Sequence, residues 1–136
     1  QVEASGEPFA APLALIGGAE RVVSVGRERG MGGRNQEYAL AAAMHIAGSE
    51  RIVMGSVDTD GTDGPGWQFV DGCGDIPVLD GGIVDGMTAR RAAALGIDLF
   101  DELKRHNTSP LLHRLGDGVI ATHNISMNDL SVTLVL

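Results

Sequence analysis

Cysteine, aromatic residues and positive charge are all scarce in this chain of 136 residues, and each shortage excludes a class of protein. Cys73 is the single cysteine, so no disulfide can form within the chain and a disulfide-rich secreted scaffold is excluded. Ten Lys and Arg residues stand against eighteen Asp and Glu residues, which argues against a nucleic acid or an anionic membrane surface as a partner. No apolar run approaches the roughly 20 residues that cross a bilayer, so we expect a cytoplasmic protein without a membrane segment.

Small residues are abundant instead. Aromatic residues make up 4% of the chain, whereas 20 residues are glycine, so the core must consist mostly of aliphatic side chains between tight turns. Helical and extended segments alternate, which predicts an α/β fold with a layered, mostly parallel or mixed sheet and helices packed on it. We expect residues 1–11 to be a linker or frayed N-terminus and residues 12–136 to be one domain. Because Gln1 is not an initiator residue, we expect the chain to be part of a longer protein.

The clearest helix is predicted for residues 34–47, which Gly48 ends. Its alanines would let it lie close to a sheet, and its stripe of Tyr38, Ala41, Ala42 and His45 makes His45 a packing residue. Before this helix we predict two strands, 12–16 and 22–25, joined by a turn at Gly17-Gly18. The other predicted strands are 51–57, 119–122 and 131–136, and the other predicted helices are 88–95, one opened by Asp98, and one from Ser109 to near Gly116.

A glycine-rich loop precedes the predicted 34–47 helix. Free N–H groups at a helix start favour an anion, and Gly32 and Gly33 would let a phosphate approach the backbone. Arg34 and Asn35 then become candidate phosphate ligands. The alternative is that the glycines only make a turn and a helix cap, with Arg34 facing water.

An acidic loop follows the predicted 51–57 strand. Asp58, Asp60 and Asp63 have no Lys or Arg between Arg51 and Arg90 to balance them, so they are candidate ligands of a cation, and Mg²⁺ is the natural choice. The alternative is a solvated turn in which the aspartates cap their own backbone.

The segment between the last two predicted strands is also polar. Asn128 and Asp129 lie near a strand end, where α/β proteins bind ligands, so they are candidate substrate contacts. An ordinary Asn/Asp turn is the alternative. The four histidines contain no pair at metal-ligand spacing, so the sequence gives no reason to propose a zinc site.

Four strings, taken in order, resemble the C-terminal MOFRL domain of class II glycerate kinases, and the resemblance runs from about residue 12 to the end. They are GGRNQE at 32–37, TDGTDGP at 59–65, GIVDG at 82–86 with a threonine at 88, and NDL at 128–130. The first two strings together are specific, whereas each glycine cluster alone would be weak.

The resemblance implies ATP-dependent, Mg²⁺-assisted phosphorylation of the 2-hydroxyl of D-glycerate or a related hydroxy acid. The cleft would lie between this domain and a larger N-terminal Rossmann-like kinase domain that is absent here and would carry the essential lysine. Arg34 would neutralise phosphate charge and Asp60 would orient the acceptor hydroxyl or the metal. The isolated chain would then be inactive, and a homo-oligomer is left open.

The chain departs from the family pattern at three places. Ala19 separates Gly17-Gly18 from Glu20, the loop 122–130 lacks the usual glycines, and residues 66–81 are inserted. These departures favour a divergent member of the family, whose substrate can differ.

Two rival functions remain open. The string 58–62 (DTDGT) also matches the nucleophile motif of haloacid-dehalogenase-like phosphatases, in which Asp58 would be the nucleophile and Asp60 the general acid/base. A non-catalytic module that binds a partner domain is the other. If the strand before the glycine loop and the 51–57 strand are parallel, Arg34 and Asp60 should share one pocket at one edge of the sheet.

Overall fold

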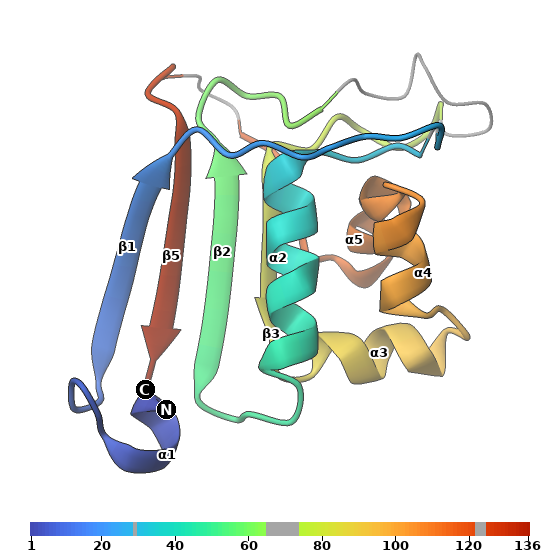
Figure 1. Ribbon diagram of the computed structural model, residues 1–136. Coiled ribbons are helices and arrows are strands. Elements are labelled where there is room, and N and C mark those ends of the chain that lie inside the picture. The colour runs from blue at the N-terminus through green and yellow to red at the C-terminus, as the bar shows by residue number, and fades with distance from the viewer. Residues whose placement is uncertain (29, 65–73, 122–124) are drawn as a thin grey trace.

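The computed structural model describes residues 1–28, 30–64, 74–121 and 125–136, and it has the predicted α/β architecture (Figure 1). Residues 66–73, which are half of the predicted 66–81 insertion, and residues 122–124 of the 122–130 loop lie outside these ranges. In chain order the elements are α1 (Val2–Ser5), β1 (Leu13–Ala19), α2 (Arg34–His45), β2 (Ile52–Asp58), β3 (Gly81–Asp85), α3 (Thr88–Ala94), α4 (Leu99–Lys104), α5 (Thr108–Leu115), β4 (Gly118–Val119) and β5 (Asp129–Val135).

The sheet has the order β1-β5-β2-β3-β4, and every neighbouring pair is antiparallel. The prediction of a mostly parallel or mixed sheet is therefore wrong. Two strands of the sheet are nevertheless parallel without being neighbours. β1 and β2 both run antiparallel to β5 and so run parallel to each other, with α2 as the crossover between them. The last strand of the chain inserts between them and gives each an antiparallel neighbour.

The glycine pair in β1 does not form the predicted turn. Gly17 and Gly18 continue the strand and pair with Ser131 and Leu130 of β5. A side chain at position 17 would press on the Ser131 hydroxyl, which explains the glycine there. The predicted strand 22–25 is also wrong, since these residues form an extended loop without sheet pairing.

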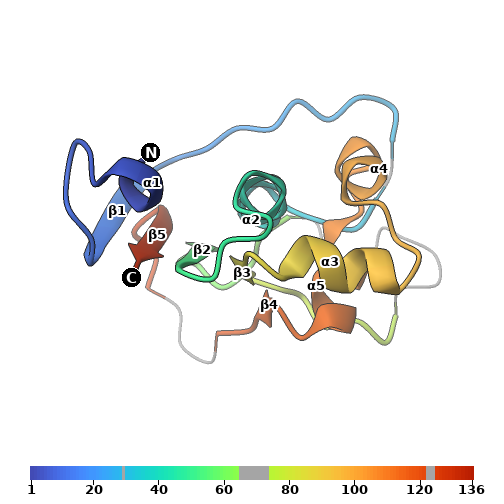
Figure 2. The ribbon, with the colours of Figure 1, turned by 90° about the horizontal axis from the view of Figure 1, so that it is seen from below.

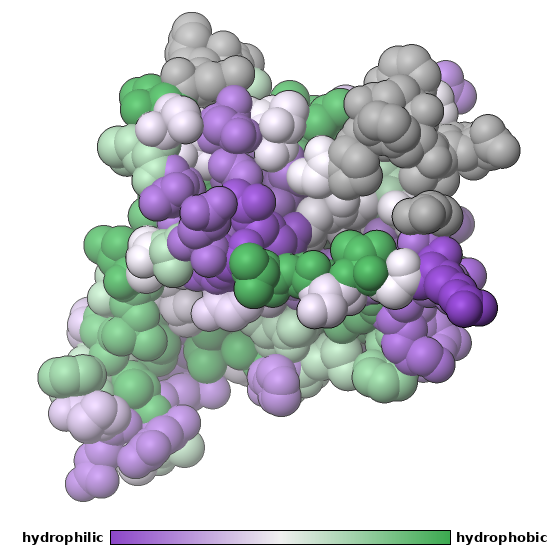
Figure 3. All heavy atoms as spheres, turned by 45° about the horizontal axis from the view of Figure 1, so that its top comes forward, coloured by the Kyte–Doolittle hydropathy of each residue, from purple (hydrophilic) through white to green (hydrophobic). Residues whose placement is uncertain are grey.

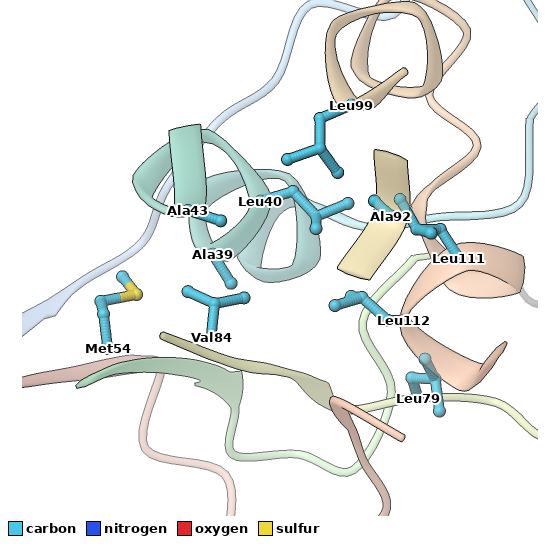
Figure 4. Close-up of a cluster of buried hydrophobic side chains, with 10 residues drawn as sticks. All are labelled: Ala39, Leu40, Ala43, Met54, Leu79, Val84, Ala92, Leu99, Leu111 and Leu112. Atoms are coloured by element: carbon cyan, nitrogen blue, oxygen red, sulfur yellow. The ribbon is translucent and has the colours of Figure 1, made fainter. Parts of the chain in front are cut away.

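Helix α2 was predicted correctly in position, but its buried face differs from the predicted stripe. Ala39, Leu40 and Ala43 are fully buried against the sheet and the neighbouring helices, whereas His45 is exposed. Figure 4 shows the small side chain of Ala39 over Val84 of β3, which lets the helix lie close to the strands. Each large aliphatic side chain buried in this core contributes about 1.5–3 kcal/mol.

The helices do not cover the whole sheet. Figure 2 shows α2 to α5 over and beside the β2–β4 part of the sheet, while β1 and β5 extend away from them with only α1 nearby. None of the helices in the described ranges is both long and apolar enough to span a bilayer.

Candidate active site

The ends of β1 and β2 and the starts of β5 and α2 lie at one edge of the sheet (Figure 1). Polar side chains from these elements contact one another there. Arg34, the first residue of α2, bridges two aspartates there. Its Nε donates to Asp129 Oδ1 at 2.9 Å, and its Nη2 donates to Asp58 Oδ2 at 2.7 Å. The glycine loop and the acidic loop therefore meet at one edge, and Asp58 is the loop residue that contacts Arg34.

Arg34 is held rigidly but is still reachable. Burial by itself would lower the pKa of Arg34, but the hydrogen bond and charge of Asp129, with the charges of Asp58 and Asp63, raise it, so the guanidinium stays charged. About a third of its side chain is exposed, with a relative accessibility of 33%. A fixed cation with accessible surface is suited to binding an anion.

Asp129 is the centre of the cluster. Its carboxylate is fully buried and accepts from the Arg21 N–H at 2.6 Å, the Asn35 amide at 2.7 Å and Arg34. Burial alone would raise the pKa of Asp129, but these donors together hold the pKa below its ordinary value. Both of its oxygens have protein partners. The sequence predicted Asp129 as a substrate contact, and in the structure its carboxylate positions Arg34.

Asp63 caps α2 from a distant loop. The N-cap residue, Gly33, has no side chain, and Asp63 replaces it by accepting from the N–H of Asn35 at 3.0 Å and of Gln36 at 2.8 Å. These are the N–H groups that an N-cap side chain normally satisfies. The anion at this helix start is therefore the protein's own carboxylate, although the sequence pattern predicted a phosphate.

Asn35 and Gln36 are fully buried and connect the cap to the rest of the fold. The side-chain oxygen Oδ1 of Asn35 accepts from the Ser56 hydroxyl at 2.6 Å. The side-chain oxygen Oε1 of Gln36 accepts from the Ser109 hydroxyl of α5 at 2.6 Å. In the described part of the chain every buried polar side-chain atom has a partner. In the structure Asn35, a candidate phosphate ligand from the sequence, is bonded to protein groups and supports the site from behind.

Gly32 and Gly33 are buried by close packing. A Cβ on Gly33 would overlap the backbone carbonyl of Asp63, and one on Gly32 would overlap the Thr108 hydroxyl. Both glycines are needed for the loops to approach one another. The turn-and-cap alternative considered from the sequence describes them better than direct phosphate contact.

Replacing Gly33 by alanine is expected to destabilise the chain by about 2 kcal/mol or more, because the added methyl group meets a rigid backbone. Gly26→Ala is the matched control, since its Cβ would have nothing within 4 Å. Urea unfolding of both variants measures the difference. Equal stabilities of the two variants would contradict this account of the loop packing.

The other two predicted contacts are exposed. Asp60 accepts from the Thr62 N–H at 3.0 Å and donates its own N–H to Asp58 at 3.3 Å. Asn128 offers its backbone, whose carbonyl accepts from the Thr59 hydroxyl at 2.8 Å. Asp60 thus lies one hydrogen bond away from the Arg34 cluster.

The three predicted metal ligands point to different partners. Asp58 contacts Arg34, Asp63 contacts the start of α2, and Asp60 bonds within its own exposed loop. Across the described residues no group of three or more His, Cys, Asp or Glu side chains is placed to hold a metal ion. These carboxylates therefore do not fit a three-aspartate Mg²⁺ site.

A pocket of about 670 Å³ opens beside Arg34. Figure 3 shows hydrophilic surface at this end of the molecule, with a hydrophobic strip beside it. Asp60 is outside the lining, so it does not share this pocket with Arg34. The lining comes from the 20–30 loop, the start of α2 and two neighbouring loops: Glu20, Arg21, Val22, Val23, Val25, Glu28, Gly30, Gly32, Gly33, Arg34, Glu37, Gly64 and His106.

Several site residues escaped the sequence reasoning. Arg21 donates to Asp129, Asn35 and the Ser131 hydroxyl and stacks on the Tyr38 ring, yet no motif marks it. Ser56 and Ser131 left a usable signal. Each lies two residues from a site aspartate on its strand, and side chains two apart share a face of the sheet.

The low pKa of Asp129 makes part of the stability depend on pH. Its folded pKa lies below the ordinary value of 3.8, so its contribution is complete above that value and is lost as the pH falls through the lowered pKa. The stability difference between the wild type and Asp129→Asn should therefore shrink as the pH falls from about 6 to about 3. Urea unfolding at several pH values checks this, and a difference that grows in acid would refute it.

Asp58 is poorly suited to be a phosphatase nucleophile. One oxygen accepts from Arg34 and the other from the Asp60 N–H. Burial raises the pKa of Asp58, although the Asp60 N–H and Arg34 oppose this. A carboxylate held by a guanidinium has little freedom to attack phosphorus, which disfavours the phosphatase alternative.

Known proteins match this chain over nearly its whole length. The model of the MOFRL family matches residues 13–128. A D-glycerate 2-kinase of Thermotoga maritima is 39% identical over the whole chain, and a glycerate 2-kinase of Pyrococcus horikoshii is 35% identical over the whole chain. The crystal structure of glycerate kinase from Thermotoga maritima superposes with a TM-score of 0.86 at 38% identity and covers 99% of the chain. The chain spans only 30% and 28% of the lengths of the two relatives and 30% of the solved chain.

Proposed function

This chain belongs to the MOFRL family, and from that premise we propose that it forms the C-terminal wall of the active site in a glycerate 2-kinase-like enzyme. The reaction would be ATP-dependent phosphorylation of D-glycerate or a related hydroxy acid. Two relatives carry the name glycerate 2-kinase, and this chain matches about 30% of their length. That share supports a second, larger part of the enzyme, the N-terminal kinase domain, as the partner that completes the site.

The observation that carries the proposal is the fixed, partly exposed guanidinium of Arg34. Asp58 and Asp129 hold it at the edge of the sheet and beside the pocket, so it faces the side where another domain would close. Phosphoryl transfer depends mainly on positioning and charge stabilisation, so a preset cation is the contribution that one wall can make. Arg34 would bind the phosphoryl oxygens as negative charge shifts during transfer.

The transfer itself conserves atoms and charge. The 2-hydroxyl oxygen of the acceptor forms a bond to the γ-phosphorus of ATP, the bond to the bridging oxygen breaks, and ADP leaves with that electron pair. The hydroxyl proton passes to a base. Asp60, exposed on the neighbouring loop, would accept a hydrogen bond from that hydroxyl and orient it.

Mg²⁺ accompanies ATP in such reactions, but Asp58 and Asp63 are engaged with Arg34 and the start of α2. The residues described here do not make a metal site by themselves. Of the three predicted metal ligands, Asp60 is the exposed one, so it could bind a metal together with residues of the N-terminal domain.

The isolated 136-residue chain is expected to produce no ADP from D-glycerate and MgATP, whereas the full-length protein that contains it should do so. The reason is that the opposing wall and its lysine are missing from the isolated chain. A coupled ADP assay on both proteins measures this. Comparable turnover by the isolated chain would refute the shared-site proposal, and an inactive full-length protein would refute the kinase activity.

A further inference from the structure

The β1–β5 half of the sheet is apolar and uncovered. No described helix except the four-residue α1 lies near it, and side chains on both faces of β1 are exposed. Leu15 on the helix side is 48% exposed, and Ile16 on the opposite side is 73% exposed. Figure 3 shows hydrophobic surface along the β1 side of the molecule.

The face of the sheet that is turned away from the helices is apolar across four strands. The register places Ile16, Val132, Gly55 and Ile83 in one row across the sheet. The neighbouring row contains Leu134, which is 40% exposed. The remaining apolar positions on this face are Ala14, Val53, Val57 and Leu130.

The polarity of β2 and β5 is the reverse of that of a solvated sheet. An antiparallel sheet with one face in water normally carries polar residues on that face and apolar ones inside. Here Ser56, Asp129 and Ser131 lie on the side of the helices, and Val132 and Leu134 lie on the open side. Such a contiguous apolar surface marks an interaction site.

The edge strand β1 is a second indication that a partner covers this half of the sheet. Proteins usually protect an edge strand with charges, proline or a covering element. The strand from Leu13 to Ala19 reads LALIGGA and contains none of these. Its pairing groups and its side chains both need a covering partner.

We propose that the uncovered β1–β5 surface is the docking surface for the N-terminal part of the full-length enzyme. This inference rests on the proposed function. The part of the Thermotoga relative that lies outside the match is roughly 70% of its length, more than twice this chain. The occupant is therefore a folded domain of about 300 residues, larger than the surface it covers.

The position of the N-terminus supports this occupant. Gln1 lies at the foot of β1 and β5, beside the uncovered half and at the end opposite Arg34 (Figure 1). Consecutive elements usually pack next to each other through short connections. A domain of about 300 residues has a radius of gyration of roughly 19 Å, so from this foot it can extend past strands about 23 Å long and reach the edge where Arg34 lies.

Thiol labelling of the full-length protein tests the surface. Ile16→Cys and Leu134→Cys report on the uncovered face, and Phe100→Cys on α4, where the phenylalanine is 57% exposed, is the control. All variants carry Cys73→Ser, and peptide mass identifies the labelled position. After normalisation to the urea-unfolded protein, positions 16 and 134 should label about 10-fold or more slowly than position 100.

Three outcomes separate the occupants and the two proposals. Protection that persists in a monomer, measured by light scattering, supports the docking surface. Labelling at positions 16 and 134 as fast as at position 100 overturns it, and protection lost on dilution of a dimer overturns it in favour of a second copy. Each variant is also assayed for D-glycerate phosphorylation, so fast labelling of an active enzyme refutes the surface alone, whereas protection in an inactive one refutes only the kinase function.

Discussion

Replacing Arg34 by alanine is expected to lower the turnover of the full-length enzyme by roughly 100-fold or more, the scale of losing one preorganised charge-stabilising donor. The guanidinium is fixed before the ligand arrives, because Asp58 and Asp129 already hold it. Its charge is therefore available to the transition state without reorganisation. The loss should appear mainly in kcat, measured in a coupled ADP assay over a range of ATP and D-glycerate concentrations.

Two further variants sharpen this test. Arg34→Lys keeps the charge but cannot bridge Asp58 and Asp129 in the same way, so its turnover should lie between those of alanine and the wild type. Arg114→Ala on α5 removes an exposed arginine that does not line the pocket beside Arg34, so it should leave turnover unchanged. Urea unfolding shows whether each variant still folds. A folded Arg34→Ala enzyme within about threefold of the wild type would remove Arg34 from the mechanism.

Local signals predicted the helices well. Asp98 was predicted to open a helix, and its side chain accepts from the N–H groups of Phe100 and Asp101 at the start of α4. Gly116 was predicted to end another helix and adopts the left-handed conformation that favours glycine there. Such signals depend on neighbours in sequence, so the sequence contains them.

Strand pairing could not be predicted in the same way. The sequence suggested that residues 22–25 run parallel to residues 51–57, but residues 22–25 form no strand. The insertion of β5 between β1 and β2 depends on contacts across more than 70 residues. The pair Gly17-Gly18 resembles a turn because glycine permits one, and only the nearby Ser131 explains its use in a strand. Pairing that is decided by tertiary contacts leaves a weak local pattern.

The family strings contain residues that the structure brings together around Arg34, and several of these residues are bonded to protein groups. Asn35, Asp63 and Asp129 were predicted to contact a ligand, and all three are buried and bonded to protein groups. Polar residues beside glycines are typical both of ligand sites and of buried networks that support them. Burial separates the two cases, and burial of a polar side chain is not visible in its local sequence.

Replacing Asp63 by alanine should therefore lower the stability of the fold, because it removes the cap of α2. The change leaves the N–H groups of Asn35 and Gln36 without a buried acceptor, and each such loss costs about 1–3 kcal/mol. Burial raises the pKa of Asp63 even though these donors oppose it, so removing the carboxylate also recovers part of its desolvation cost. We expect a net loss of about 3 kcal/mol in the free energy of unfolding, measured in urea at neutral pH.

Asp60→Ala is the matched control, because it removes the same side chain from an exposed position on the same loop and should cost less than about 1 kcal/mol. Asp63→Asn keeps one acceptor oxygen but turns an amide N–H₂ toward a backbone donor, so its stability should fall between those of Asp63→Ala and the wild type. The order matters more than the absolute values. If Asp60→Ala and Asp63→Ala were equally stable, Asp63 would not be the cap of α2, and its carboxylate would again be a candidate for binding a ligand.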